Sequence, residues 1–240
     1  MKEKNEKIEM LNRFVQNTDV HIFLTGKAGT GKTTFLRNLA ANTYKRMVVV
    51  APTGVAAINA GGVTIHSFFQ LPFGPIVPGG QQTAEGGQQA SLLSNKISRT
   101  KLKIMRSLDL LVIDEISMVR SDLLDAVDSV LRRFRNRNKP FGGVQLLMIG
   151  DLQQLTPVVT DEEAQLLSSY YPTPYFFGSR ALHQVDYVTI ELKEVYRQQD
   201  EKFISILNSV REGRPSAEVI KTLNSRYDPS FMPSSDEGYI

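Results

Sequence analysis

The sequence predicts an α/β fold with a mostly parallel sheet and helices on both of its faces. Five apolar runs of strand length recur along the chain: "HIFLT", "MVVVAP", "LDLLVID", "VQLLMIGD" and "DYVTIEL". They are rich in Val, Ile and Leu and do not alternate with polar residues, a pattern typical of strands that are covered on both faces. Segments with helical periodicity lie between them, and strands that alternate with helices favour βαβ crossovers and parallel pairing.

Helices are expected at the N-terminus and after the third apolar run. Residues 1–18, which begin "MKEKNEKIEM", are expected to form an N-terminal helix. After Ser121, which we expect to be an N-cap, apolar residues recur at a spacing of 3.6 and define one buried helix face. The residues of that face are Leu123, Leu124, Val127, Val130, Leu131 and Phe134.

Residues 71–100 interrupt the alternation and are expected to form an irregular insertion. The stretch 71–89, "LPFGPIVPGGQQTAEGGQQ", is dense in Gly, Pro and Gln and has no period. This composition is typical of a surface loop, and a binding loop that becomes ordered on its partner is the alternative.

Residues 19–235 are expected to form one domain that contains this insertion. Near its end, a helix-like "DEKFISILNSVREG" and a second short helix precede "DPSFMPSSDEGYI". The final Tyr239 and Ile240 resemble the beginning of a strand. Residues 236–240 are therefore expected to open a second domain, whose remainder lies outside this sequence.

Composition excludes several classes of protein. The chain has 240 residues, of which 41% are hydrophobic, and this is ample for a buried core. It has no cysteine, which excludes disulfides and thiolate metal sites, and its three histidines are scattered. The N-terminus lacks the apolar segment of a secretory signal, and no apolar run approaches the roughly 18–20 residues of a membrane span. The net charge of +3 is only a mild indication of a polyanionic partner.

A phosphate-binding loop follows the first apolar run. In "FLTGKAGTGKTTF", residues 26–33 match the pattern G-x-x-x-x-G-K-[ST] between a predicted strand and a predicted helix. Glycines allow successive backbone N–H groups to surround phosphate oxygens, and the start of the helix adds a positive end. A lysine ammonium about 4 Å from a phosphate charge contributes roughly 4 kcal/mol at an effective dielectric constant near 20, before desolvation. The residues expected to bind phosphate are Gly26, Ala28, Gly29, Thr30, Gly31, Lys32, Thr33 and Thr34.

Two adjacent carboxylates, Asp114 and Glu115, follow the apolar run "LLVI". Burying an unpaired carboxylate costs several kcal/mol, and adjacent strand residues point to opposite faces. We therefore expect the chain to leave the sheet at this point, with the acidic strand beside the phosphate-loop strand. Asp114 and Thr33 would then hold Mg²⁺, and Glu115 would polarise the attacking water as a general base.

Further stretches resemble a family of DNA helicases. A GTPase is set aside, because the Asn-Lys pairs in "NKIS" and "NKPF" lack the aspartate that reads guanine. "VVVAPTGVAAINAGGVTIHSFF" and "MIGDLQQLTPV" resemble the DNA-facing and coupling motifs of superfamily 1 helicases. With "GKAGTGKTTF", "DEISMV" and "ELKEVYRQ" they resemble, over about residues 20–212, the petite-integration-frequency (PIF) family of 5′-to-3′ DNA helicases, which is related to RecD.

The resemblance implies that residues 19–235 are the first RecA-like ATPase domain of a helicase, a P-loop nucleoside triphosphatase fold. It implies binding of ATP and Mg²⁺ and catalytic roles for Lys32 and Glu115. Gln154 would sense the γ-phosphate, and Arg197 would stabilise the charge of the transition state. A glutamine expected some seventeen residues before the phosphate loop is absent, and Gln16 lies too close to the loop. The residues therefore leave the preference for adenine open.

The resemblance also implies a grip on single-stranded and fork-like DNA. The residues that match this grip are Pro52, Thr53, Gly54, Thr64 and His66. Without the resemblance, His66 is a loop or core histidine.

Other residues have a structural and a DNA-binding interpretation. Phe68 and Phe69 could stack on bases, but core packing is favoured. The basic segment 132–139 favours a solvated helix C-terminus over a role in tracking DNA.

The expected activity is that of an ATP-dependent helicase motor domain in DNA repair, recombination, replication or telomere maintenance. We expect a monomer that binds no membrane, is completed by a second RecA-like domain of the same full-length chain, and by itself hydrolyses ATP weakly without unwinding DNA. The location would be the cytoplasm, with the nucleoid in a bacterium, or the nucleus or mitochondrion in a eukaryote. One alternative is a ring-forming P-loop ATPase that remodels protein, which would not need "APTGVAA" or "TIHSFF". The other is a nucleic-acid-binding module with a vestigial ATP site. The residues that argue against it are the intact Lys32, Thr33, Asp114, Glu115 and Arg197.

Overall fold

The structure, a computed structural model, describes residues 2–78, 97–194 and 200–232. The chain divides into two compact units, residues 1–197 and 198–240. The smaller unit contains α8 (Glu201–Arg211) and α9 (Ala217–Asn224) in its described part. One domain over residues 19–235 stays a prediction, as does a second domain from residue 236, because residues 236–240 lie outside the described part.

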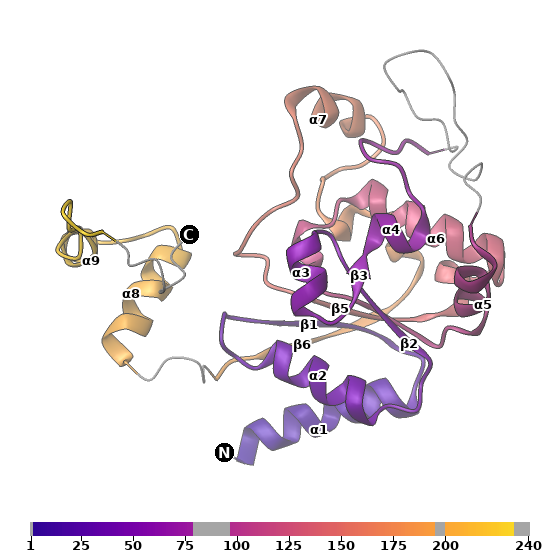
Figure 1. Cartoon of the computed structure of the whole chain (residues 1–240), viewed down its shortest axis with the longest axis horizontal. Helices are drawn as coiled ribbons and strands as arrows, with labels where there is room; N and C mark the ends of the chain where they lie inside the picture. Colours follow the sequence, from indigo (N-terminus) through magenta and orange to yellow (C-terminus); the bar gives the residue numbers. More distant parts are fainter. Residues whose placement is uncertain (1, 79–96, 195–199, 233–240) are drawn as a thin grey trace. The chain divides into compact units, whose positions relative to one another are not determined.

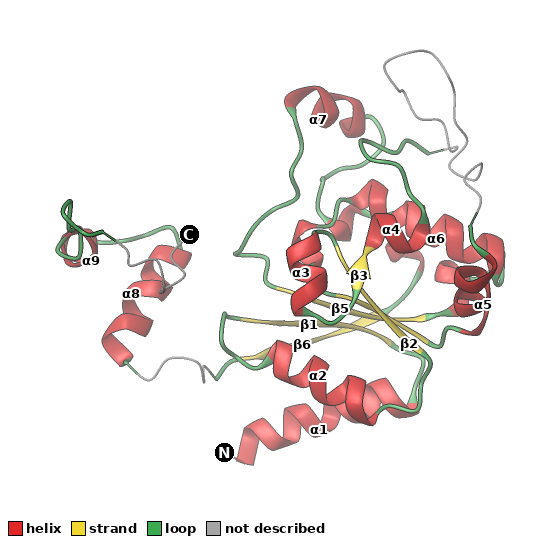
Figure 2. Ribbon diagram, viewed as in Figure 1, coloured by secondary structure: helices red, strands yellow, loops and turns green. Residues whose placement is uncertain are grey.

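The larger unit contains a six-stranded sheet in the order β3-β2-β4-β5-β1-β6, and every strand pair is parallel (Figure 2). The strands are β1 (His21–Gly26), β2 (Met47–Ala51), β3 (Val63–Thr64), β4 (Leu110–Ile113), β5 (Gln145–Gly150) and β6 (Tyr187–Leu192). All but the two-residue β3 are the apolar runs that the sequence predicted. Every residue of β4 and β5 is buried, as predicted for strands covered on both faces. For β6 this prediction is wrong: Tyr187, Thr189 and Glu191 are exposed and alternate with more buried residues, because successive side chains point to opposite faces and one face of this strand is open to solvent.

The expectation that the acidic strand lies beside the phosphate-loop strand is wrong. β5 lies between β4 and β1 and pairs with both, so that Leu147 lies opposite Ile22 on one side and Val112 on the other. β4 and β5 are both buried along their whole length, so either could have a neighbour on each edge, and the local pattern does not fix which of them pairs with β1. Because β5 lies between β4 and β1, the loop that follows β5 emerges between the phosphate loop and the acidic pair.

Helices cover both faces of the sheet (Figure 1). On one face lie α1 (Lys2–Asn17) and α2 (Lys32–Asn42), and on the other lie α4 (Ile65–Phe69), α5 (Arg99–Ser107) and α6 (Ser121–Phe134). Phe68 and Phe69 are buried in the hydrophobic core between the sheet and α4, α5 and α6, so core packing, which the sequence favoured over base stacking, is confirmed. The remaining helices are α3 (Gly54–Asn59), α7 (Asp161–Ser168) and the 3₁₀ turns Ile116–Met118, Pro140–Gly143, Phe176–Gly178 and Leu182–Gln184.

The described residues test the expectations about α6 and about the irregular insertion. The apolar face of α6 is buried as expected, but Ser121 is not its N-cap. Arg120 occupies that position, and the Ser121 hydroxyl donates instead to the carbonyl of Thr173 at 2.6 Å. Residues 71–78 have no helix or strand, as expected of the insertion, while residues 79–96 lie outside the described part.

An ion pair joins the starts of β2 and β4. The Arg46 side chain donates to Asp109 at 2.7 and 2.6 Å, and the Arg46 backbone N–H donates at 3.0 Å. These hydrogen bonds lower the pKa of Asp109 to about 2. Both side chains are partly exposed, so solvent screens their attraction.

We expect Asp109→Asn to lower the urea midpoint at neutral pH modestly. A carboxyl group with a lowered folded pKa stabilises the fold above its unfolded pKa, and this contribution disappears as the pH falls from about 4 to 2. The deficit of the variant, measured by urea unfolding, should therefore shrink over this range. Asp19→Asn, which alters a carboxylate with a 97% exposed side chain, is the control. A deficit that stays constant down to the lowest pH would contradict the assignment.

Candidate active site

The carboxyl ends of the strands bring the predicted site residues to one edge of the sheet. β1 leads into the phosphate loop, β4 into Asp114 and Glu115, and β5 into Asp151. β2 and β3 lead into the two segments that were expected to grip DNA. This edge is where ligands bind in open parallel α/β sheets.

Two glycines shape the phosphate loop. Gly26 has φ 152°, and a Cβ there would lie 2.4 Å from the carbonyl oxygen of Leu192. Gly31 has φ 93° and is the N-cap of α2, without a capping side chain. The first backbone N–H groups of α2 therefore start directly at the loop, an arrangement that suits an anion.

The Lys32 side chain binds backbone carbonyls of the phosphate loop. Its ammonium donates to the carbonyl oxygens of Gly26 at 2.5 Å and of Lys27 at 3.0 Å. The Thr30 hydroxyl donates to the same Lys27 carbonyl at 2.9 Å. The phosphate loop is thus a formed cradle with a positive charge in it.

A cavity of about 390 Å³ lies against this cradle. Its lining residues are Ala28, Gly29, Thr30, Gly31, Lys32, Thr33, Thr34, Glu115 and Gln154. All of them are residues that the sequence predicted for the site. Gly26 and Asp114 are not in this lining, although Gly26 contacts Lys32 through its carbonyl.

The chain leaves the sheet between the two carboxylates, as expected. The backbone N–H of Asp114 still donates to the carbonyl of Val50, at 2.9 Å. Glu115 adopts a left-handed conformation with φ 51° and ψ 45°. Such a conformation costs a non-glycine residue about 1–3 kcal/mol and is typical of functional sites. This turn allows the Glu115 side chain to line the cavity.

Burial raises the pKa of both carboxyl groups. For Glu115 the negative charge of Asp114 adds to the effect of burial, and Lys32 opposes it. For Asp114 a hydrogen bond from the Glu115 backbone and the charge of Lys32 oppose burial. Glu115 lines the same cavity as Thr33, and carboxylate and hydroxyl oxygens are the ligands that a hard divalent cation prefers.

Asp151 is a site residue that the sequence analysis missed. It is 2% exposed, and its carboxylate accepts from the Gln154 side chain at 3.0 Å and from the Gln153 backbone N–H at 3.1 Å. These bonds hold the Gln154 amide at the cavity. The available signal was its position directly after an apolar strand, which is the signal that singled out Asp114.

The two segments expected to grip DNA lie side by side. β2 and β3 pair so that Ala51 lies opposite Thr64, which brings the loop of Pro52–Gly54 next to Thr64 and His66. The hydroxyl oxygens of Thr53 and Thr64 cap α3 and α4, each accepting a backbone N–H at 3.2 Å. Because a hydroxyl can accept and donate at once, both threonines can still donate to another acceptor.

His66 is half-buried and packs against an aromatic ring. Burial, followed by the positive charge of Arg120, lowers the pKa of His66. Its imidazole is therefore neutral at neutral pH. The ring stacks on Phe73 with 4.9 Å between ring centroids.

Two further interpretations from the sequence concern Arg197 and the basic segment 132–139. Arg197 lies outside the described residues. In the basic segment 132–139, Arg132 bonds to Asp128, and Arg135 donates to the carbonyls of Met105 and Arg106 at 2.9 and 2.8 Å. Arg132 and Arg135 are thus partly buried and hold parts of the fold together, so the expectation of a solvated helix end does not describe them.

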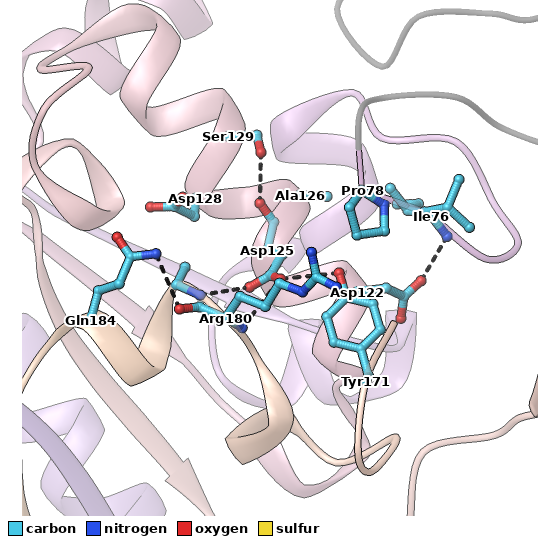
Figure 3. Close-up of a pocket in the computed structure, with 12 residues that line it drawn as sticks. Ile76, Pro78, Asp122, Asp125, Ala126, Asp128, Ser129, Tyr171, Arg180 and Gln184 are labelled. Carbon is cyan, nitrogen blue, oxygen red and sulfur yellow. Dashed lines mark hydrogen bonds between the residues drawn. The ribbon is translucent and has the colours of Figure 1, made fainter. Parts of the chain in front are cut away.

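A second pocket, of about 190 Å³, lies against α6 (Figure 3). Asp125 accepts hydrogen bonds there from the Tyr171 hydroxyl at 3.0 Å, from the Ser179 hydroxyl, and from the backbone N–H groups of Arg180 and Ala181 at 3.2 and 3.0 Å. Burial, followed by the Asp125 charge, raises the pKa of Tyr171 far above its usual range. Because these polar groups bind one another, this pocket is a joint between α6 and residues 171–181.

We expect Asp125→Ala to lower the free energy of unfolding by about 2–5 kcal/mol. The change leaves several buried donors without an acceptor, and each such donor costs about 1–3 kcal/mol. Urea unfolding would measure this loss. Ser129→Ala, on the exposed side of the same helix, should change stability by less than about 0.5 kcal/mol. An Asp125→Ala effect no larger than that of the control would contradict the joint.

None of the helices in the ranges that the structure describes is long and apolar enough to cross a membrane.

Comparisons with known proteins identify the family. Residues 2–221 match the family model described as PIF1-like helicase. The human ATP-dependent DNA helicase PIF1 is 39% identical over 206 residues, which cover 85% of this chain and 29% of the human protein. The ATP-dependent DNA helicase RRM3 of Saccharomyces cerevisiae is 35% identical over 212 residues, which cover 85% of this chain and 27% of that protein.

Solved structures agree in fold. The Pif1 helicase from Bacteroides in complex with ADP-AlF3 and ssDNA matches with a TM-score of 0.87 and 40% identity, over 96% of this chain and 51% of that chain. The Pif1 helicase from Candida albicans matches with a TM-score of 0.73 and 30% identity, over 97% and 49%. The predicted RecA-like α/β fold is thereby confirmed, and the chain spans about half the length of these solved chains. On the match of residues 2–221, this chain belongs to the PIF1-like helicase family.

Proposed function

We propose that this chain is an ATP-hydrolysing motor domain that grips single-stranded DNA, the first RecA-like domain of a 5′-to-3′ DNA helicase. The observation that carries the proposal is the cavity in which the phosphate loop faces Glu115 and Gln154. The family and the Bacteroides Pif1 structure with ADP-AlF3 and ssDNA support it. Family membership also leaves the ring-forming ATPase without support.

The phosphate loop would bind the triphosphate. Lys32, whose ammonium lies among the loop carbonyls, would donate to phosphate oxygens together with the first N–H groups of α2. Thr33 and Asp114 would hold Mg²⁺. When bound, this ion would neutralise charge on the phosphate oxygens.

Hydrolysis would depend on three further side chains. Glu115, as the ionised carboxylate, would take the proton of the attacking water. Gln154, which Asp151 holds in place, would contact the γ-phosphate. Arg197 would stabilise the charge that develops on it.

The DNA grip would use the neighbouring loops. Thr53 and Thr64 would donate their hydroxyl protons to backbone phosphates while they cap α3 and α4. The second RecA-like domain of the full-length protein would supply the opposite side of the DNA and ATP sites. We therefore propose weak hydrolysis and no unwinding by this chain alone, and for the full-length protein a monomeric helicase acting on fork-like DNA in repair, recombination or replication.

Binding of a labelled single-stranded oligonucleotide, followed by fluorescence anisotropy at low salt, tests the proposed function. We expect the chain to prefer the single strand over a duplex of equal length. We also expect its affinity to change when a non-hydrolysable ATP analogue and Mg²⁺ are added. Nucleotide binding without any preference for single-stranded DNA would contradict the motor assignment.

Glu115→Gln should separate binding from chemistry. Without its general base, the chain should hydrolyse ATP about 10²- to 10⁴-fold more slowly, while its affinities for the ATP analogue and for DNA stay close to the wild-type values. Phosphate release in single-turnover assays would measure the rate. Glu162→Gln, in the exposed first turn of α7, is the matched control and should hydrolyse like the wild type. Equal rates for the two variants would remove Glu115 from the mechanism.

A further inference from the structure

We propose that Phe73, stacked on His66, forms a platform for a nucleobase of single-stranded DNA. The inference rests on the proposed function, because it adds a base contact beside the backbone grip of Thr53 and Thr64. The sequence offered a binding loop over residues 71–89 only as an alternative and did not single out Phe73. The phenylalanines that were considered for base stacking, Phe68 and Phe69, are buried in the core.

Phe73 is exposed in a segment that otherwise buries its apolar side chains. Leu71, Ile76 and Val77 are 6%, 3% and 7% exposed, whereas Phe73 is 84% exposed. An exposed phenylalanine forgoes the stabilisation that its burial would provide. Its outward position between buried neighbours leaves the ring accessible to a ligand.

The backbone around Phe73 is held firmly. The carbonyl of Gly74 accepts from the Arg120 guanidinium at 2.6 Å, and the backbone N–H of Ile76 donates to the Asp122 carboxylate at 2.8 Å, a bond drawn in Figure 3. Arg120 and Asp122 form a buried ion pair with each other at 2.8 Å. A ring on such a support loses little conformational entropy when a ligand stacks on it, which favours binding.

The His66 ring supports Phe73 from one side. The two rings lie 23° from parallel with centroids 4.9 Å apart. His66 belongs to α4, whose N-cap Thr64 is one of the proposed phosphate contacts. A strand held at Thr64 by its phosphate therefore carries a base close to this ring pair.

A nucleobase fits this surface. Among residues 71–78, Phe73 is the exposed large apolar side chain, and its single flat ring has the shape that stacks on a nucleobase. Every base has a flat π-face, and stacking on an aromatic ring requires no particular base sequence. This matches a motor that must move along any sequence.

A single tryptophan makes the contact observable, because the chain contains no tryptophan. In Phe73→Trp, the indole fluorescence should be quenched when single-stranded DNA binds, and an oligonucleotide that keeps its phosphates but lacks bases should not quench it. Tyr44→Trp is the matched control. Tyr44 is 77% exposed and precedes the amino end of β2, at the sheet edge opposite the proposed grip. Its tryptophan should respond to neither oligonucleotide.

Affinities test the same contact without a reporter. Phe73→Ala should weaken binding of the normal oligonucleotide about 5- to 150-fold, the range expected for one base–aromatic stack. It should leave binding of the base-free oligonucleotide unchanged. Phe73→Tyr, which keeps the ring, should restore most of the affinity. Melting temperatures close to that of the wild type would show that the variants are folded.

The outcomes distinguish this inference from the function on which it rests. If the wild-type chain binds single-stranded DNA but Phe73→Ala binds it equally well and Phe73→Trp is not quenched, the platform is refuted while the proposed function stands. Such a result would make Phe73 a contact for a protein partner. If the wild-type chain binds no single-stranded DNA, both proposals fall.

Discussion

The insertion of β5 between β4 and β1 is the constraint on which the rest of the site depends. β5 is buried along its whole length and pairs in parallel with both neighbours. Because of this pairing, the loop after β5 emerges between the phosphate loop and the acidic pair. Asp151 and Gln154 therefore share one cavity wall with Lys32 and Glu115. Direct pairing of β4 with β1 would place Gln154 elsewhere and leave the cavity without it.

Helix α6 holds three other segments of the chain in place through its carboxylates. Asp122 accepts the backbone N–H of Ile76, Asp125 accepts those of Arg180 and Ala181, and Asp128 accepts that of Phe141. Carboxylates buried to this extent are stable only when their oxygens are fully hydrogen-bonded, and here each one fastens a segment distant in sequence. α6 also follows directly on the acidic loop. The hydrolysis site and the loop that presents Phe73 therefore share one rigid support, through Arg120 and Asp122.

At the carboxyl edge of the sheet, single residues serve both the fold and the site. The threonines that cap α3 and α4 satisfy helix N–H groups and keep a proton to donate. Glu115 has a strained, left-handed backbone conformation, and this conformation directs its side chain away from the sheet beside Asp114. In both cases the local backbone determines where a polar group points, and the chemistry of the site follows from that direction.

The sequence by itself determined the features that depend on neighbouring residues. The phosphate loop, the buried character of β4 and β5, the apolar face of α6 and the turn after Asp114 follow from short-range sterics, glycine conformations and hydrophobic periodicity. Tertiary structure decided the strand order, the N-cap at Arg120 in place of Ser121, the support that Asp151 gives to Gln154, and the exposure of Phe73. These features depend on contacts between residues far apart in the chain, such as Ile22 with Leu147 and Ser121 with Thr173. A local pattern carries no information on which of several apolar strands will be neighbours, because each could satisfy the same hydrogen bonds and burial.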